Sequence, residues 1–169
     1  MYPFLDVGPG CSNPSPLLYS LQNSNFNASS VLYDTHFPVL SRFGIERIVN
    51  VQPDVWIPST NMIGQWIQVD FNAPIRIEQI EIRPRPTASQ WISSYKLALS
   101  SDGVTYEVMQ ALNDEDRIFN GPTSETDYVT TKLNITTRFL RLLPQTFESH
   151  MALSWEVYTC IEGRQIKLT

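Results

Sequence analysis

The sequence feature that most constrains the fold is the position of the two cysteines, which lie near opposite ends of the chain. Cys160 closes residues 152–160, in which apolar and polar side chains alternate from Leu153 to Tyr158. This period-two pattern predicts a β-strand with one buried face. If Cys160 and Cys11 form a disulfide, this strand is the seam of one large loop, a closure that contributes about 5 kcal/mol in the chain-entropy model. The alternative is two separate buried thiols.

The charge balance excludes one class of function. The 169 residues carry a net charge of −5, whereas a nucleic-acid binder needs clustered Lys and Arg to release counterions. The same charge weakens, without excluding, attraction to an anionic membrane. No apolar run approaches the roughly 20 residues that cross a bilayer. With 42% apolar and 17% charged residues, the chain is expected to form one globular domain with a core of its own.

The expected location is extracellular. Residues 1–6 lack the basic start and long apolar stretch of a signal peptide, so the chain is either cytosolic or has lost its signal. The placement of the cysteines favours the second explanation, because disulfides persist in oxidising compartments. Two N-glycosylation sequons, at Asn27 and Asn134, point weakly the same way. We therefore expect a secreted protein or the ectodomain of a cell-surface protein.

Short alternating or isoleucine-rich segments, separated by Pro, Gly and Asn, dominate the chain. They predict strands at 25–30, 65–71, 75–83, 91–100, 104–110, 128–133, 138–143 and 152–160. Because helical periodicity of useful length is missing, we expect an all-β sandwich or jelly roll. The domain is expected to cover 11–160, between a flexible lead at 1–10 and a tail at 161–169. Part of the tail matches a protease recognition sequence built into expression vectors, so an engineered origin is left open.

Three loops are unusual because they carry apolar and aromatic side chains where loops are normally polar. They cover residues 31–42, 54–64 and 83–90. In the third loop, Pro84 and Pro86 prevent the sheet from continuing. These are the segments of most interest for ligand contact.

Seven segments occur in the order found in one known protein family. They are residues 11–14 (CSNP), 27–30 (NASS), 65–71 (QWIQVDF), 91–97 (WISSYKL), 100–106 (SSDGVTY), 137–144 (TRFLRLLP) and 152–160 (ALSWEVYTC). Together they resemble the discoidin domain, also called the coagulation factor five/eight type C domain, over nearly the whole of 11–160. No single segment is decisive, but their order makes the resemblance specific.

The resemblance implies a β-sandwich of about eight main antiparallel strands whose ends are joined by a Cys11–Cys160 disulfide. It also implies a role in adhesion, with the ligand met by three apex loops at the opposite end, here 32–42, 55–64 and 83–90. The chain departs from the family pattern in the segment after its first cysteine and in the stretch leading to Trp56. The third apex loop is also short, so relatives with a long third loop do not predict this ligand.

The sequence carries no recognisable catalytic or metal-binding motif. Of its two histidines, His36 lies in the first apex loop and His150 is expected to hydrogen-bond a neighbouring loop. Nucleophile-elbow, zinc-protease and phosphate-loop motifs are all missing. The acidic run at 113–116 lacks the spacing and glycine of a calcium-binding EF loop, and a solvated turn is the better interpretation. We expect a non-enzyme without a cofactor; weak calcium binding occurs in some relatives, but no site for it can be placed.

The candidate ligand-contacting residues lie in the three apex loops. They are Tyr33, Asp34, His36, Phe37, Trp56, Ile57, Asn61, Met62, Arg83, Arg85 and Gln90. Flat aromatic rings beside planar donors and acceptors suit a sugar, so we favour a cell-surface glycan or glycoprotein as partner. An oligomer or a parent protein would supply multivalency. The alternatives are an anionic phospholipid membrane entered by apolar side chains, and a protein ligand whose carboxylate binds Arg83 or Arg85.

Several of these residues also have a purely structural interpretation. Trp56 is equally expected to pack the base of its own loop. Trp155 is expected in the core, and Trp66 and Trp91 begin strands and are expected to pack there too. Arg138, Arg141 and Glu156 lie in strands beside buried neighbours, which indicates structural pairing.

Overall fold

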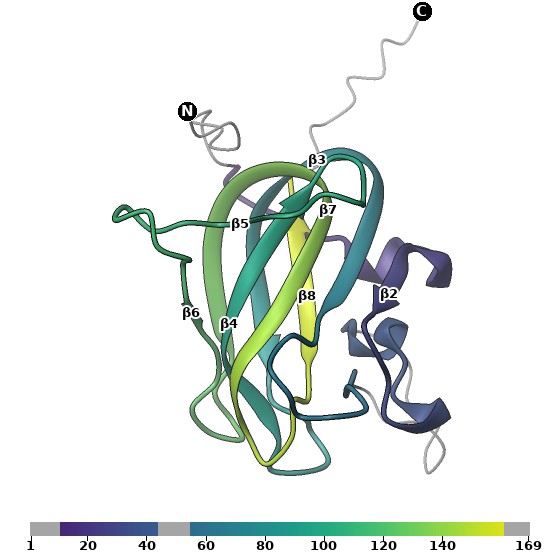
Figure 1. The fold of residues 1–169 in the computed structure, drawn as a ribbon. Coiled ribbons are helices and arrows are strands. Elements are labelled where there is room, and N and C mark those ends of the chain that lie inside the picture. Colours follow the sequence, from purple (N-terminus) through teal and green to yellow (C-terminus); the bar gives the residue numbers. More distant parts are fainter. Residues whose placement is uncertain (1–10, 44–54, 161–169) are drawn as a thin grey trace, which may run out of the picture.

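The computed structural model describes residues 11–43 and 55–160 as an all-β protein (Figure 1). Its strands are β1 (Ser15–Pro16), β2 (Phe26–Ala28), β3 (Ile67–Arg83), β4 (Trp91–Ser100), β5 (Glu107–Val108), β6 (Phe119–Asn120), β7 (Val129–Glu148) and β8 (Ser154–Thr159). Four short 3-10 helices are η1 (Leu18–Ser20), η2 (Asn23–Asn25), η3 (Tyr33–Thr35) and η4 (Pro38–Ser41). The predicted lead at 1–10 and tail at 161–169 lie outside the described residues. None of the helices in the described ranges is long and apolar enough to cross a membrane.

Two long strands, β3 and β7, bend and take part in both layers of the sandwich. Residues 67–70 of β3 pair with 139–142 of β7, whereas residues 75–82 pair with 129–137, with a register shift between the two halves. The sheet order is β1-β8-β3-β7-β4-β5, with β2 also on β3 and β6 also on β4, and all of these pairings are antiparallel. The four strands predicted within these segments are therefore two bent strands, because the chain changes layer without leaving the sheet.

The core lies between the two layers and is built from alternate residues of the long strands. Ile80 and Ile82 of β3 and Leu140 and Leu142 of β7 are fully buried. Trp155 of β8 is also fully buried, as predicted, and its indole N–H donates to the Ser41 hydroxyl over 3.0 Å. That bond satisfies the one polar atom that the ring brings into the core.

Strand β8 is buried on both faces, which corrects the prediction of one solvent-facing side. Its carboxylate residue, Glu156, is 1% exposed because the N-terminal segment covers it. Glu156 Oε1 accepts the backbone N–H groups of Leu17 over 3.1 Å and Leu18 over 2.6 Å. Burial raises the pKa of this carboxyl, although these hydrogen bonds oppose the shift. The predicted structural role of Glu156 is thus confirmed, and it joins residues far apart in sequence.

The two cysteines form the predicted disulfide. Cys11 and Cys160 are bonded with their Cα atoms 5.8 Å apart, across a sequence separation of 149 residues. The pairing of Ser15 with Thr159 continues the contact between the two ends of the domain. Glu78 lies beside the two sulfurs, but a disulfide has no thiolate to offer a metal ion.

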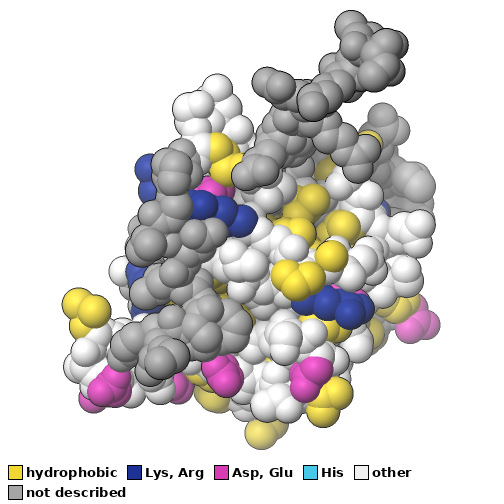
Figure 2. All heavy atoms as spheres, turned by 90° about the horizontal axis from the view of Figure 1, so that it is seen from above, with side chains coloured by type: hydrophobic (Ala, Val, Ile, Leu, Met, Phe, Trp, Pro, Cys, Tyr) yellow, Lys and Arg dark blue, Asp and Glu magenta, His cyan; other side chains and the backbone are white. Residues whose placement is uncertain are grey.

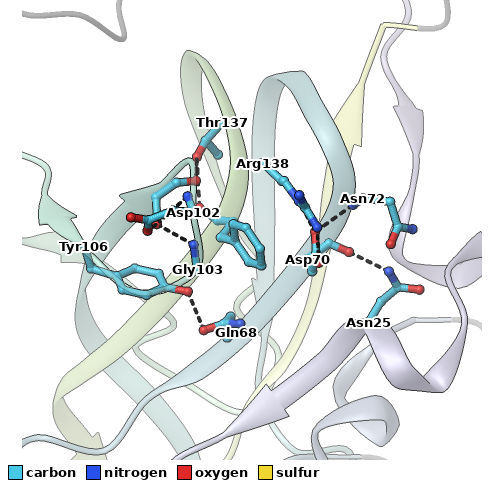
Figure 3. A network of polar contacts seen from close by, with 11 residues as sticks. Asn25, Gln68, Asp70, Asn72, Asp102, Gly103, Tyr106, Thr137 and Arg138 are labelled. Atoms are coloured by element: carbon cyan, nitrogen blue, oxygen red, sulfur yellow. Dashed lines mark hydrogen bonds and ion pairs between the residues drawn. The ribbon is translucent and has the colours of Figure 1, made fainter.

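The turns at the disulfide end are fixed by a polar network (Figure 3). Arg138 contacts both carboxylate oxygens of Asp70 over 3.0 Å, and Asn25 donates to the Asp70 carbonyl over 2.7 Å. This confirms the structural role predicted for Arg138. In the adjacent turn, hydrogen bonds from two backbone amides lower the pKa of Asp102 to about 2. Figure 2 looks down on this end and shows Lys and Arg side chains at separate places on the visible surface.

Two segments differ locally from the predictions. The first apex loop contains η3 and η4, and Pro38 begins η4, where its fixed φ favours the helix and its missing N–H costs nothing. The predicted strand at 104–110 shortens to β5, because Asp102 draws the amides of the following residues into its own turn. Both differences arise where a local hydrogen bond or proline competes with the sheet.

Candidate functional site

The three apex loops lie at the end of the sandwich opposite the disulfide (Figure 1). The third apex loop and residues 149–153 are neighbours there, because Arg83 at the end of β3 pairs with Ser154 at the start of β8. The second apex loop joins them through the bridge between Trp56 and Leu153. The first is attached by the Leu32 N–H, which donates to the Ile57 carbonyl over 2.8 Å. The topology therefore gathers the three predicted loops at one end.

Trp56 and Ile57 do not form the exposed apolar rim that was expected. They are 0% and 1% exposed, and Ile57 packs with Val55 and Ala152 in a small core of its own. The indole of Trp56 donates to the Ser30 carbonyl over 3.0 Å. The alternative interpretation of Trp56, as a side chain that packs the loop base, is the correct one. Both residues hold the second apex loop in place. Because they are buried, they are no longer candidates for ligand contact.

The exposed apolar side chains of the apex form two groups. In the first apex loop, Tyr33 is 74% exposed and Phe37 43% exposed. In the second, Met62 is 67% exposed and is followed by exposed Ile63. Tyr33 has a φ of +59°, a left-handed conformation that a bulky residue adopts only where its surroundings impose it. The structure therefore presents one aromatic group and one aliphatic group to solvent.

Asn61 joins the second apex loop to residues 149–151. Its amide nitrogen lies 3.0 Å from His150 Nδ1, and its amide oxygen accepts the Met151 N–H over 3.1 Å. The contact confirms that His150 bonds a neighbouring loop. It also occupies the donor and acceptor that Asn61 would otherwise offer a ligand, so Asn61 positions the loop.

Arg83 is occupied by contacts within the protein. Its guanidinium lies 2.6 Å from Glu81 Oε1 and stacks over the ring of Phe43 at 3.8 Å and that of Tyr128 at 4.7 Å. Sequence reasoning missed both aromatic residues. The signal that was available is the Glu81–Arg83 spacing, since residues two apart share one face of a strand. Arg83 thus holds neighbouring segments together and is not available as a free cation for a ligand.

Arg85 is held differently, although only one residue separates it from Arg83. It donates to the Gln90 side-chain oxygen over 2.7 Å and to the Thr87 hydroxyl over 3.0 Å. Both partners are neutral, and no carboxylate within the described residues pairs with it. The backbone bond from Arg85 N–H to the Gln90 carbonyl, 2.9 Å long, closes the third apex loop beneath the two side chains. Arg85 and Gln90 therefore form a fixed pair whose positive charge is not neutralised by any acid in residues 11–43 and 55–160.

His36 is 9% exposed and lies within electrostatic range of the Arg85 guanidinium. Its Nδ1 is 2.9 Å from the Leu32 carbonyl, which can only accept, so Nδ1 carries the hydrogen and Nε2 has a lone pair. Burial and the nearby Arg85 guanidinium lower the pKa of His36 and keep the ring neutral at pH 7. Nε2 is buried and has no hydrogen-bond partner among the residues that the structure describes. A buried acceptor without a partner needs an explanation, such as an ordered water or a bound ligand.

The site that the structure supports is smaller than the predicted one. It consists of His36, Arg85 and Gln90, with Tyr33 and Phe37 as exposed rings on the same loop as His36. Asp34 is exposed on that loop and remains a candidate. Together these residues offer a cationic donor, a neutral acceptor, an amide and flat apolar surface.

Comparison with known proteins supports the predicted family and fold. The sequence model of the family described as F5/8 type C domain matches residues 25–157. The non-catalytic subunit of the venom prothrombin activator pseutarin-C of Pseudonaja textilis is 26% identical over 160 residues, covering 89% of this chain and 11% of the relative. The chain thus spans about a tenth of that protein.

Solved structures show the same architecture. Wild-type discoidin II from Dictyostelium discoideum matches with a TM-score of 0.75 and 22% identity, covering 88% of this chain and 59% of that one. The module CpGH89CBM32-5 from Clostridium perfringens, solved in complex with GalNAc-β-1,3-galactose, matches with a TM-score of 0.61 and 16% identity. That match covers 86% of this chain and 100% of the module. The predicted all-β sandwich with a terminal disulfide is confirmed.

Proposed function

Because the chain belongs to the F5/8 type C domain family, whose members are generally non-catalytic binding modules, we propose that it binds a carbohydrate through its apex loops and catalyses no reaction. The observation that carries this proposal is His36 Nε2, which is buried and has no partner among the described residues, within electrostatic range of Arg85, which Gln90 holds in place. The chain is extracellular, as predicted: its disulfide is of a kind that persists in oxidising compartments, and one of the relatives that it matches is a subunit of a venom prothrombin activator.

Sugar hydroxyls match the hydrogen-bonding groups of this site. A hydroxyl both donates and accepts, so one hydroxyl can donate to His36 Nε2 while a neighbouring hydroxyl accepts from Arg85. Gln90 holds the guanidinium in position, so little side-chain freedom is lost on binding. An unprotonated imidazole is required, and the lowered pKa of His36 supplies it at neutral pH. This arrangement selects ligands with adjacent hydroxyl groups.

The exposed rings supply the second ingredient of sugar recognition. The C–H face of a pyranose packs against an aromatic ring, and Tyr33 and Phe37 present such surface on the same loop as His36. The complex of CpGH89CBM32-5 with GalNAc-β-1,3-galactose supports this class of ligand, since the two chains share their fold. A shallow site of this size binds weakly, so adhesion would need several copies acting together.

One observation favours a second function, binding to a phospholipid membrane. Met62 and Ile63 are adjacent and exposed in the second apex loop, where they can enter the headgroup region. Two findings oppose it: Ile57 is buried, and Arg83 is paired with Glu81 instead of being available to a phosphate. The protein-ligand alternative retains Arg85 alone as its anchor. Carbohydrate binding uses more of the observed site than either alternative.

A glycan array probed with a multivalent form of the protein tests the proposal. We expect binding that a soluble sugar competes away, with about tenfold weaker binding for Tyr33→Ala, which corresponds to about 1.4 kcal/mol for one aromatic contact. Tyr19→Ala is the matched control, because Tyr19 is 63% exposed and lies on η1, outside the apex loops. Arg85→Ala should weaken binding as well.

Liposome sedimentation separates the membrane alternative. The proposal expects no sedimentation with phosphatidylserine vesicles. Sedimentation that is lost in the Met62→Ser, Ile63→Ser double variant, but kept in Leu112→Ser, would establish membrane binding instead. Leu112 is a suitable control because it is fully exposed on the loop between β5 and β6.

A further inference from the structure

One of the two sequons lies at an exposed irregularity of the β3–β7 ladder. Residues Asn134-Ile135-Thr136 lie within β7, and the side chain of Asn134 is exposed while Ile135 is buried. We propose that Asn134 carries an N-linked glycan on its side-chain nitrogen.

The backbone at Asn134 turns its side chain out of the sheet. Ile77 pairs with Ile135 and Gln79 with Lys132, so Leu133 and Asn134 together lie opposite Glu78. Two residues opposite one make a β-bulge, and Asn134 has a φ of +51°, a conformation that asparagine tolerates better than most residues. Leu133 and Ile135 on either side point into the core. The bulge therefore lets two neighbouring side chains stay buried while the amide between them projects into solvent.

The amide of Asn134 is also chemically available. Within the described residues, no hydrogen bond engages its side chain or the hydroxyl of Thr136, the third sequon residue. A glycan attached at the nitrogen would therefore displace no hydrogen bond within the described residues.

The Asn27 sequon is different. There the side-chain oxygen accepts the Ala28 N–H over 2.8 Å. The Ser29 hydroxyl donates to the Gln65 side chain over 2.6 Å and accepts the Trp66 N–H over 3.0 Å. In the folded protein these groups join the end of β2 to the start of β3. The Asn27 sequon is therefore an internal comparison for the Asn134 sequon.

The modification is a transfer of an oligosaccharide from a lipid pyrophosphate donor. The Asn134 nitrogen forms a bond to the anomeric carbon of the first sugar and loses one proton. The bond between that carbon and the pyrophosphate oxygen breaks, and the lipid pyrophosphate leaves with the electron pair. No oxidant or reductant takes part. Because the chain is extracellular, it passes through the secretory pathway, where the lipid pyrophosphate donor is present.

The position of Asn134 is compatible with ligand binding at the apex. Its neighbour in the sheet, Glu78, lies beside the disulfide sulfurs, at the end of the sandwich opposite the apex loops. A glycan there would cover the region around the joined ends of the chain and leave His36 and Arg85 open. Loss of the glycan is therefore expected to leave apex binding unchanged.

The test is mass spectrometry of the full chain secreted from a eukaryotic cell behind a heterologous signal peptide. The polypeptide alone has a mass of 19.3 kDa. We expect a heavier protein whose excess is removed by peptide N-glycosidase, with Asn134 converted to ¹⁸O-labelled Asp when the digest is run in H₂¹⁸O. Wild-type protein without a label at position 134, including protein labelled only at position 27, would overturn the proposal.

Variants at Thr136 give a matched pair that leaves the left-handed residue untouched. Thr136→Val removes the hydroxyl and should abolish the label at position 134, whereas Thr136→Ser keeps the sequon and should keep the label. A label that persists in Thr136→Val would overturn the assignment to N-linked transfer. Since the wild-type peptide map gives the answer by itself, poor folding of a variant does not remove the test.

Discussion

Removing the disulfide tests how the ends of this domain are held together. The perturbation is the double variant Cys11→Ser, Cys160→Ser. The bond closes a loop with a separation of 149 residues, and in the chain-entropy model such a loop loses about 17 cal/mol/K of unfolded-state entropy, or about 5 kcal/mol at 25 °C. The folded state changes little, because the β1–β8 pairing and the bonds from Leu17 and Leu18 to Glu156 still hold the two ends together.

Urea unfolding at pH 7 measures this loss. We expect the free energy of unfolding to fall by about 5 kcal/mol, and the m-value to rise because the unfolded chain becomes less compact. Binding at the apex should be unaffected at temperatures where the variant is folded. A loss below about 1 kcal/mol with an unchanged m-value would refute the entropic reasoning.

Three further variants probe other parts of the structure. Ile57→Ala should lower the free energy of unfolding by about 2–5 kcal/mol, because it leaves a cavity at a buried position. Met62→Ala, at an exposed position, should change it by less than about 0.5 kcal/mol. Equal effects of the two variants in urea titrations would mean that Ile57 is not buried. Gly121→Ala should fold poorly, because a Cβ there overlaps the backbone carbonyl of Ile92, which cannot move aside. A cooperative thermal transition at the wild-type temperature would contradict this overlap. Asp102 has a pKa of about 2 in the folded state, below its ordinary 3.8, so its stabilising effect is present above about pH 4 and is lost as the pH falls toward 2. Asp102→Asn should therefore lower the thermal midpoint near pH 6, with a difference from wild type that shrinks on acidification; a constant difference would exclude the proposed hydrogen bonds.

The framework could be predicted from the sequence because period-two patterns report burial directly. Residues 91–100 were predicted as a strand, and β4 covers the same residues. Bends within a strand leave no such signal. In β3, Asn72 takes a φ of +66° and the chain changes layer while remaining in the sheet. A local pattern interrupted by polar residues therefore looks like two strands, although the hydrogen-bonded ladder is one.

The candidate site was harder to predict, because its geometry depends on contacts between distant residues. Trp56 and Ile57 are apolar residues in a loop, and nothing local tells an exposed rim from a packed base. Leu153 and Ala152, almost a hundred residues later, decide their burial. Arg83 and Arg85 likewise look equivalent in sequence, but only Arg83 shares a strand face with Glu81. Long-range packing therefore divides the predicted loops into residues that hold the site and residues that face the ligand.

The most direct test of the central claim is a ¹H–¹⁵N NMR titration with the sugar that the array identifies. Carbohydrate binding at the proposed site predicts saturable shifts in the signals of Tyr33, His36, Arg85 and Gln90, and unchanged signals in the turn around Asp102 at the disulfide end. Shifts confined to the disulfide end, or no shifts at the four apex residues at saturating sugar, would contradict it.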